Sequence, residues 1–164
     1  MINKHQQKGA ETVEFAMIAL LFFAVLFAII EFSRALFVWN ALTEATRRGA
    51  RMAVICPVGN VIPKNVAIFD DKAGSSKGKS PIINGLTIEN VTVSYLNQVG
   101  TAEANQMLIK FAQVSITGYT HKLIIPLWGS SVTAPAFTTT LPIESLGAVP
   151  TYPGEDKIDP DCKF

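Results

Sequence analysis

Residues 9–54 read GAETVEFAMIALLFFAVLFAIIEFSRALFVWNALTEATRRGARMAV and predict one long α-helix. The first half, residues 15–30, carries no charge and consists almost entirely of Phe, Leu, Ile, Val, Ala and Met, so no face of it suits water. At about 1.5 Å per residue it spans roughly 24 Å, which is short of the ~30 Å hydrocarbon core of a bilayer unless Thr12, Val13 and Phe32 contribute or the bilayer thins. The pattern predicts a single, marginal membrane span over residues 15–30.

The second half of this helix is expected to leave the membrane and become amphipathic. Residues 31–54 mix apolar residues with charged ones, namely Glu31, Arg34, Glu44, Arg47, Arg48 and Arg51. The helix should end after residue 54, because Cys56 precedes Pro57 and further Gly and Pro residues follow. One half of the helix therefore anchors the chain, and the other half packs on a domain.

Length and charge limit the function classes. With 164 residues, 49% of them hydrophobic, the chain has room for the helix and one domain of roughly 100 residues, over residues 55–164. Its formal net charge of +1 provides no long-range attraction to nucleic acid, so we expect no nucleic-acid partner. The basic cluster of Arg47, Arg48 and Arg51 has Glu44 beside it, and we interpret it as a solvated or interface face.

The two cysteines, Cys56 and Cys162, lie just after the helix and close to the end of the sequence. Their pairing is a hypothesis, since sequence alone does not bring two thiols within bonding reach, and two unpaired thiols are the alternative. A disulfide closing a loop of about 100 residues contributes up to ~4.7 kcal/mol in the chain-entropy model. It also implies an oxidising compartment, with everything after the span outside the cytoplasm.

The N-terminal residues 1–8 are polar and basic and precede Gly9, as in an ordinary secretory signal. Two features disagree: no pair of small residues with a turn follows the apolar run, and Glu14 lies in the first turns of the helix. A carboxylate at a bilayer edge is costly and usually has a partner. A cut after Gly9 would supply one, because the new amine of Ala10 would lie four residues before Glu14, within reach of its own carboxylate or a neighbouring subunit's.

Gly9, followed by four residues and then Glu14 and Phe15 ahead of an apolar run, resembles the processing site of type IVb (Flp class) prepilins, which a membrane prepilin peptidase cuts after the glycine. Residues 31–36 read EFSRAL, Asn40 follows, and residues 45–51 read ATRRGAR. This is similar to the TadE-like family of tight-adherence pilus proteins, which typically shows E-F-G-R-A-L, an asparagine and A-A-R-E-G-A-R. The departures are Ser33 for Gly, Thr46 for Ala and Arg48 for Glu. The last places a like charge beside Arg47 and Arg51 and is expected to alter a subunit contact.

The resemblance implies a pilin-like subunit, either a minor pilin or a pseudopilin, with residues 1–9 as a leader. It would lie in the bacterial inner membrane with its C-terminal domain outside the cytoplasm. The extracellular pilus is a second location that the resemblance allows. Its implied partners are other pilin and pseudopilin subunits, prepilin peptidase, the inner-membrane assembly platform and membrane lipid. The assembly residues that it implies are Glu14, Glu31, Arg34, Asn40, Arg47 and Arg51.

The rest of the chain predicts β-structure. Apolar and polar residues alternate over residues 88–96, 112–117 and 137–143, and Asn84-Gly85 suits a two-residue hairpin turn. Residues 66–69 are a possible short strand, and residues 123–128 are an edge segment or buried loop because they contain Pro126. Three or four antiparallel strands with one apolar face result, and the second half of the helix can cover that face. The expected fold class is α+β.

No catalytic constellation stands out, and we expect neither an enzyme, a cofactor nor a metal site. Residues 73–80, AGSSKGKS, resemble a phosphate loop, but Pro81 and a turn follow where a helix is needed, so we interpret them as a surface loop. His121 lacks a nearby Cys, Asp or Glu and is expected at the surface, and the acids after residue 150 match no calcium loop. Two alternatives to the pilin interpretation are an uncleaved membrane-anchored binding or adhesion module and a secreted domain released by ordinary signal cleavage.

Overall fold

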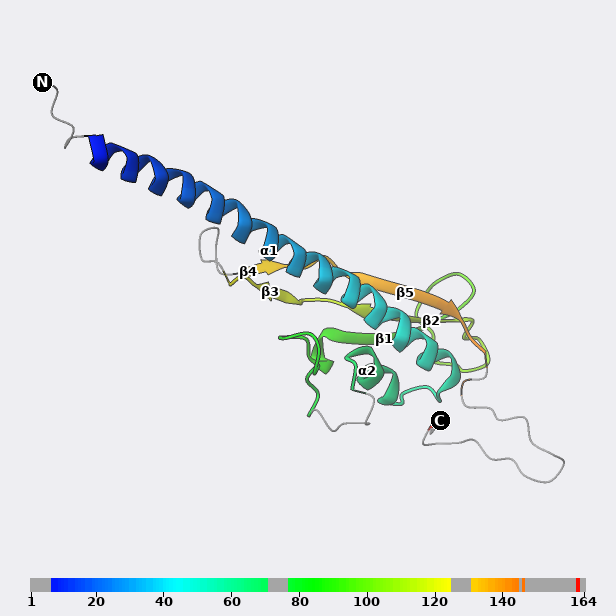
Figure 1. Cartoon of the computed structure of the whole chain (residues 1–164). Helices are drawn as coiled ribbons and strands as arrows, with labels where there is room; N and C mark the ends of the chain where they lie inside the picture. The colour runs from blue at the N-terminus through cyan, green and yellow to red at the C-terminus, as the bar shows by residue number, and fades with distance from the viewer. Residues whose placement is uncertain (1–6, 71–76, 125–130, 145, 147–161, 163–164) are drawn as a thin grey trace, which may run out of the picture.

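One helix runs through the whole molecule. In the computed structural model, which describes residues 7–70, 77–124, 131–144, 146 and 162, helix α1 spans Gln7–Ile55. Its N-terminal half projects away from the domain, and its C-terminal half lies along it (Figure 1). The helix ends directly before Cys56 and Pro57, as predicted, because a proline ring restricts the preceding residue to extended conformations.

A short helix, α2, spans Ile62–Ala67 and packs on α1. The prediction of a short strand over residues 66–69 is therefore wrong. Pro63 lies in the first turn of α2, where its missing N–H is not needed, and Phe69 leaves the helix with a left-handed φ of 64°. The Asn84-Gly85 turn is present, with Gly85 at φ 87°, but a single isolated bridge between Lys79 and Thr87 flanks it instead of a hairpin of two strands.

The strands form two antiparallel sheets. A 3-10 turn, Ile88–Asn90, leads into β1 (Val91–Leu96), which pairs with β2 (Phe111–Ile116), and β2 pairs in turn with β5 (Phe137–Pro142). The second sheet has two strands, β3 (Thr120–Lys122) and β4 (Ser131–Thr133). The α+β class and the long helix on a small antiparallel sheet are thus confirmed.

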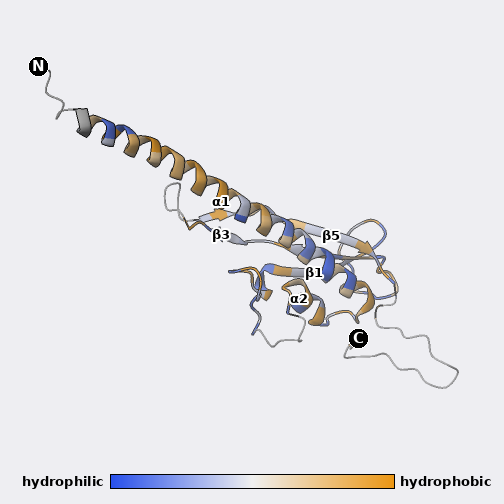
Figure 2. Ribbon diagram, in the orientation of Figure 1, coloured by the Kyte–Doolittle hydropathy of each residue, from blue (hydrophilic) through white to orange (hydrophobic). Residues whose placement is uncertain are grey.

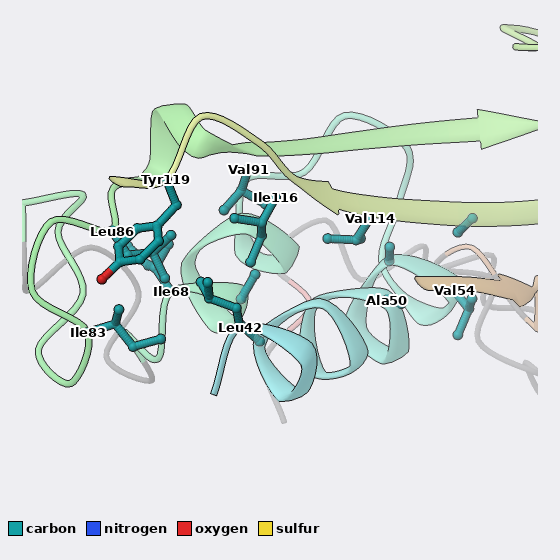
Figure 3. Packing of buried hydrophobic residues seen from close by; sticks show 14 residues of the cluster. Leu42, Ala50, Val54, Ile68, Ile83, Leu86, Val91, Val114, Ile116 and Tyr119 are labelled. Atoms are coloured by element: carbon teal, nitrogen blue, oxygen red, sulfur yellow. The ribbon is translucent and has the colours of Figure 1, made fainter. Parts of the chain in front are cut away.

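The core lies between the C-terminal half of α1 and the three-stranded sheet. Every second residue of β2 is buried, namely Ala112, Val114 and Ile116, which is the period of a strand with one covered face. Side chains of α1, including Leu42 and Val54, face those of β1 and β2 across this core (Figure 3). A further contact is polar: the hydroxyls of Thr46 and Thr139 on β5 lie 2.8 Å apart, and Thr46 is buried.

Gly49 permits a close approach between α1 and α2. A Cβ atom built there would lie 2.8 Å from Cβ of Ala67, 3.1 Å from the carbonyl oxygen of Pro63 and 3.2 Å from Cγ1 of Val114. We expect Gly49→Ala to lower the free energy of unfolding by a net ~1–2 kcal/mol, since overpacking costs about 1–3 kcal/mol and the gain in helix propensity returns at most ~1 kcal/mol. Thermal unfolding of the detergent-solubilised chain measures this change.

The matched control for Gly49 is the double variant Gly49→Ala/Ala67→Gly, which removes the nearest Cβ atom and should recover part of the loss. A Gly49→Ala protein as stable as the wild type would contradict the close packing seen here.

Tyr95 on β1 makes the domain sensitive to alkaline pH. Its hydroxyl is buried with no hydrogen-bond partner among the described residues, and burial raises the pKa of Tyr95 above its ordinary value of 10.0. The folded state therefore holds this proton more tightly than the unfolded chain. The resulting stabilisation is complete below about pH 10 and is lost as the pH rises through the folded-state pKa.

Replacing Tyr95 with Phe should raise the free energy of unfolding at neutral pH by up to about 1 kcal/mol, because it removes an unpaired buried hydroxyl, and should reduce the loss at alkaline pH. Tyr119→Phe is the matched control, since the Tyr119 hydroxyl donates to the carbonyl oxygen of Asn84 at 3.1 Å and its removal should cost about 1 kcal/mol. Urea unfolding at neutral and alkaline pH compares the two. Equal destabilisation by both variants would contradict the conclusion that the Tyr95 hydroxyl is buried without a hydrogen-bond partner.

The end of the domain is tied to the end of α1. Cys56 and Cys162 form a disulfide with a Cα–Cα distance of 5.5 Å, as hypothesised, and both residues are buried. The backbone N–H groups of Glu144 and Leu146 also donate to the carbonyl oxygen of Val54. Glu144, Leu146 and Cys162 are thus held at the C-terminus of α1 by hydrogen bonds and a covalent bond.

Several sequence-based expectations fall wholly or partly outside the described residues. They concern most of the predicted leader, most of the apolar segment 123–128 and the acids after residue 150. Of the AGSSKGKS segment, residues 77–80 are described; the hydroxyl of Ser80 accepts hydrogen bonds from the N–H groups of Ile82 and Ile83. Turns and bends rather than a helix occupy residues 81–85, which agrees with a surface loop and not with a phosphate loop.

Candidate assembly surface on the long helix

The N-terminal half of α1 is an uncovered apolar rod. Its most apolar window of 18 residues has a mean hydropathy of 2.8, and none of that window is buried inside the molecule, so the helix is long and apolar enough to cross a membrane. Figure 2 shows this half as a continuous hydrophobic stretch. Phe23 contacts Phe22 edge-on and stacks on Phe27, but these contacts lie within the helix and leave the side chains exposed.

Glu14 interrupts the rod near its beginning. The residue is exposed, it lies one turn after Ala10, and it has no ion-pair partner among the described residues. Gly9 and Ala10 are exposed too, in the first turns of α1, where backbone N–H groups lack intrahelical partners and helices fray. Phe15, next to Glu14, is 71% exposed. The residues of the predicted processing site thus form one accessible segment.

The C-terminal half of α1 presents a stripe of exposed residues. We call its members the outer stripe; they recur at intervals of three or four residues and comprise Ser33, Leu36, Phe37, Asn40, Glu44, Arg47 and Arg51. Such spacing places them on one face of the helix. Three predicted assembly residues, Asn40, Arg47 and Arg51, are therefore brought together on a free face. The N-terminal part of the outer stripe contains the apolar residues Leu36 and Phe37, and its C-terminal part is charged.

Glu31 and Arg34 have a different environment, because they contact the protein's own domain. The carboxylate of Glu31 accepts a hydrogen bond from Nη1 of Arg34 at 2.7 Å and another from the backbone N–H of Ile124 at 3.2 Å, and it lies 3.5 Å from Nε2 of His121. We call these four residues the Glu31 clamp. Only 13% of the Glu31 side chain is exposed. The clamp joins the end of β3 to α1.

His121 corrects an expectation. It was predicted at the surface, but it is 4% exposed, because the alternation along β3 turns it inward while Thr120 and Lys122 face solvent. Its partner Glu31 is 90 residues earlier in the sequence, so no local pattern could reveal the contact. Arg34 and His121 also line an open cavity of about 430 Å³ beneath α1.

Comparison with known protein families gives a match within helix α1. Residues 9–51 match the family described as TadE-like protein. This segment is TadE-like. The match covers the predicted processing site, the apolar rod and the outer stripe, and it ends before α2 and the strands. No curated protein and no solved structure matches the chain. TadE-like proteins form a pilus-associated family with structural rather than enzymatic roles.

Three positions of the TadE-like segment contact the chain's own domain. Arg48, which was expected to alter a subunit contact, lies over the ring of Phe69 with its guanidinium carbon 5.1 Å from the ring centre, so it faces the protein's own domain. Gly49 is the close-packing position described above. Thr46, where the family pattern has Ala, pairs with Thr139. The TadE-like pattern therefore combines an outward face with an inward one.

The Glu31 clamp can be tested by removing its carboxylate. Glu31→Ala should leave the N–H of Ile124 without its acceptor and remove the carboxylate that lies 3.5 Å from Nε2 of His121, and so lower the local stability of β3 and β4 by about 1–3 kcal/mol. Amide hydrogen exchange measures this as faster exchange at His121 and Val132, the hydrogen-bonded pair of this ladder, than in the wild type. Glu44→Ala is the matched control, because Glu44 is an exposed acid on the same helix. Equal exchange in the two variants would show that the clamp does not stabilise these strands.

Proposed function

We propose that the chain is a structural minor pilin or pseudopilin that takes part in assembling a tight-adherence type IVb pilus. The observation that carries this proposal is α1 itself. A single TadE-like helix has one half that is apolar and uncovered and another half that holds a folded domain. A subunit that is first stored in a membrane and then packed into a filament requires both halves.

We propose the following arrangement. Residues 1–9 form a leader that prepilin peptidase removes after Gly9, residues 10–54 form the helix with its span at 15–30 in the bacterial inner membrane, and residues 55–164 form a domain outside the cytoplasm. The Cys56–Cys162 disulfide supports that side of the membrane, because disulfides persist in oxidising compartments. The exposure of Gly9 and Ala10 supports access by the peptidase.

Assembly follows from the need to cover the apolar rod. A helix that leaves lipid must bury its apolar side chains elsewhere, and packing against other pilin and pseudopilin helices does this. Glu14 would set the register by pairing with the amine of an Ala10 terminus. Asn40, Arg47 and Arg51 of the outer stripe would contact neighbouring subunits or the assembly platform. For Glu31 and Arg34 an interface role stays a prediction, since both contact their own domain.

The deciding experiment is to read the N-terminal residue of the protein from native membranes and pili by mass spectrometry. A start at Ala10 supports the proposal. A start at Met1 or Ile2 would indicate an uncleaved membrane-anchored module that binds or adheres through its domain. Loss of the entire apolar run would indicate an ordinary secreted domain.

A further inference from the structure

We propose that the β3–β4 pair rests on the lipid headgroup layer beside α1 and provides a second contact with the bilayer. This inference depends on the proposed anchoring of α1 in a membrane. It concerns a part of the chain outside the TadE-like segment.

The Glu31 clamp sets the height of β3 along α1. Glu31 is the first charged residue after the uncharged run 15–30, so it marks the end of the proposed span. Its carboxylate accepts a hydrogen bond from the backbone N–H of Ile124 at 3.2 Å, which places Ile124, two residues past the end of β3, within one side-chain length of that boundary. Figure 1 shows β3 and β4 as the part of the domain nearest the N-terminal half of α1.

The shortness of the span brings this part of the domain close to the headgroups. A run covering roughly 24 Å meets a hydrocarbon core of ~30 Å either by thinning the bilayer or by drawing the next residues into it. Phe32, the next apolar residue after the run, is 65% exposed and available for this. Drawing Phe32 into the core moves Ile124 toward the lipid, and thinning the bilayer keeps Glu31, and with it Ile124, at the boundary.

The exposed chemistry of the β3–β4 pair suits a headgroup layer. Ile124 is 69% exposed and Val132 is 43% exposed, while Lys122 presents an exposed cation on the same pair of strands. Val132 pairs with His121 and so lies on the other face of the pair from Lys122, which gives the pair exposed apolar or cationic side chains on both faces. At a membrane interface, apolar side chains enter the acyl boundary and an ammonium group reaches phosphate. Glu31 does not oppose this contact, because Arg34 pairs with it and most of its side chain is buried.

The opposite end of the domain supplies an internal control. Val99 and Met107 are 86% and 88% exposed, and they lie in the β1–β2 connection. This connection is at the end of the sheet near Val54, since Ile143 bonds Lys110 and the next residue, Glu144, bonds Val54. At about 1.5 Å per residue, that end is roughly 35 Å farther along α1 than Glu31, too far to touch the same bilayer.

The test uses the full chain in nanodiscs of phosphatidylcholine and phosphatidylglycerol that contain a lipid with a nitroxide on its headgroup. We expect NMR signals from the amides of Ile124 and Val132 to broaden and those of Val99 and Met107 to stay sharp. A second sample with an acyl-chain nitroxide reports on Phe22. If Phe22 broadens but Ile124 and Val132 broaden no more than Val99, the inference is overturned while the anchoring stands. If Phe22 does not broaden, the anchoring itself fails and the inference fails with it.

Two variants sharpen this test. Ile124→Asp should cause loss of the broadening at Val132, because a carboxylate is repelled by anionic headgroups and disfavoured at the acyl boundary. Val99→Asp, an equivalent change at the distal end, should leave the broadening unchanged. Both sites are exposed, and unshifted amide signals from β1 and β2 will verify that each variant is folded. Broadening at Val132 that survives Ile124→Asp would overturn the proposal.

Discussion

Glu14→Ala is expected to remove the protein from pili while leaving its insertion into the membrane intact. The change takes away the charge in the first turns of α1 that lacks a partner among the described residues, and it makes the proposed span more apolar, not less. In an assembled bundle the carboxylate would pair with the amine of an Ala10 terminus, and without it that amine would be buried unpaired, at a cost of about 3–5 kcal/mol per subunit. A loss of this size corresponds to more than a hundredfold in an association constant.

The comparison that isolates this effect is Glu11→Ala, since Glu11 is an exposed acid in the same turns of α1, three residues earlier. The amount of protein in sheared pili and in the membrane fraction, each measured by immunoblot, separates assembly from insertion. Glu11→Ala should resemble the wild type in both fractions. Normal amounts of the Glu14→Ala protein in pili would refute the proposed role of Glu14.

Removing the disulfide is expected to cause the largest loss of stability in the domain. The double variant Cys56→Ser/Cys162→Ser should lower the free energy of unfolding by about 2–5 kcal/mol, because the bond links residues 106 apart and its loss frees the unfolded chain to expand. Both sulfurs belong to buried residues, so each serine also introduces a buried hydroxyl. Urea unfolding of the detergent-solubilised protein measures the change.

Reduction of the wild-type protein distinguishes the effect of losing the disulfide from the effect of the two introduced serines. Dithiothreitol should destabilise the wild type by a similar amount and leave the double variant unaffected. If the reduced and oxidised wild-type proteins unfold at the same urea concentration, the bond contributes nothing to stability.

Much of the fold could be predicted because its signals are local. The uncharged run predicts the apolar half of α1, Pro57 predicts its end, and the alternation in residues 112–117 predicts β2 with its buried face. The TadE-like motifs are contiguous in sequence as well. These features depend on side chains within a few residues of one another. The hydrophobic periodicity and the local composition of the sequence therefore reveal them directly.

The failures share a different cause, which is contact between distant segments. Residues 66–69 are apolar enough for a strand, but packing on α1 and the position of Pro63 favour a helical turn. His121 was predicted at the surface, but β3 places it against Glu31, and the contact of Arg48 with Phe69 was not predicted either. In each case the partner lies outside the window that a periodicity argument examines.

The unbroken helix α1 also fixes the angle, about the helix axis, between Glu14 and the outer stripe. Residues 10–48 contain neither proline nor glycine, so nothing in this sequence favours a bend or a swivel between the membrane half and the domain half. Each residue turns the helix by about 100°, so deleting one residue between Glu14 and Asn40 would point the Glu14 carboxylate about 100° away from its present bearing relative to the outer stripe. Inserting seven residues, about two turns, into the intact helix would instead nearly preserve this bearing. For the relative direction of Glu14 and the outer stripe, the length of the helix therefore matters less than its rotational phase. Insertions in the loops of the domain do not change this angle.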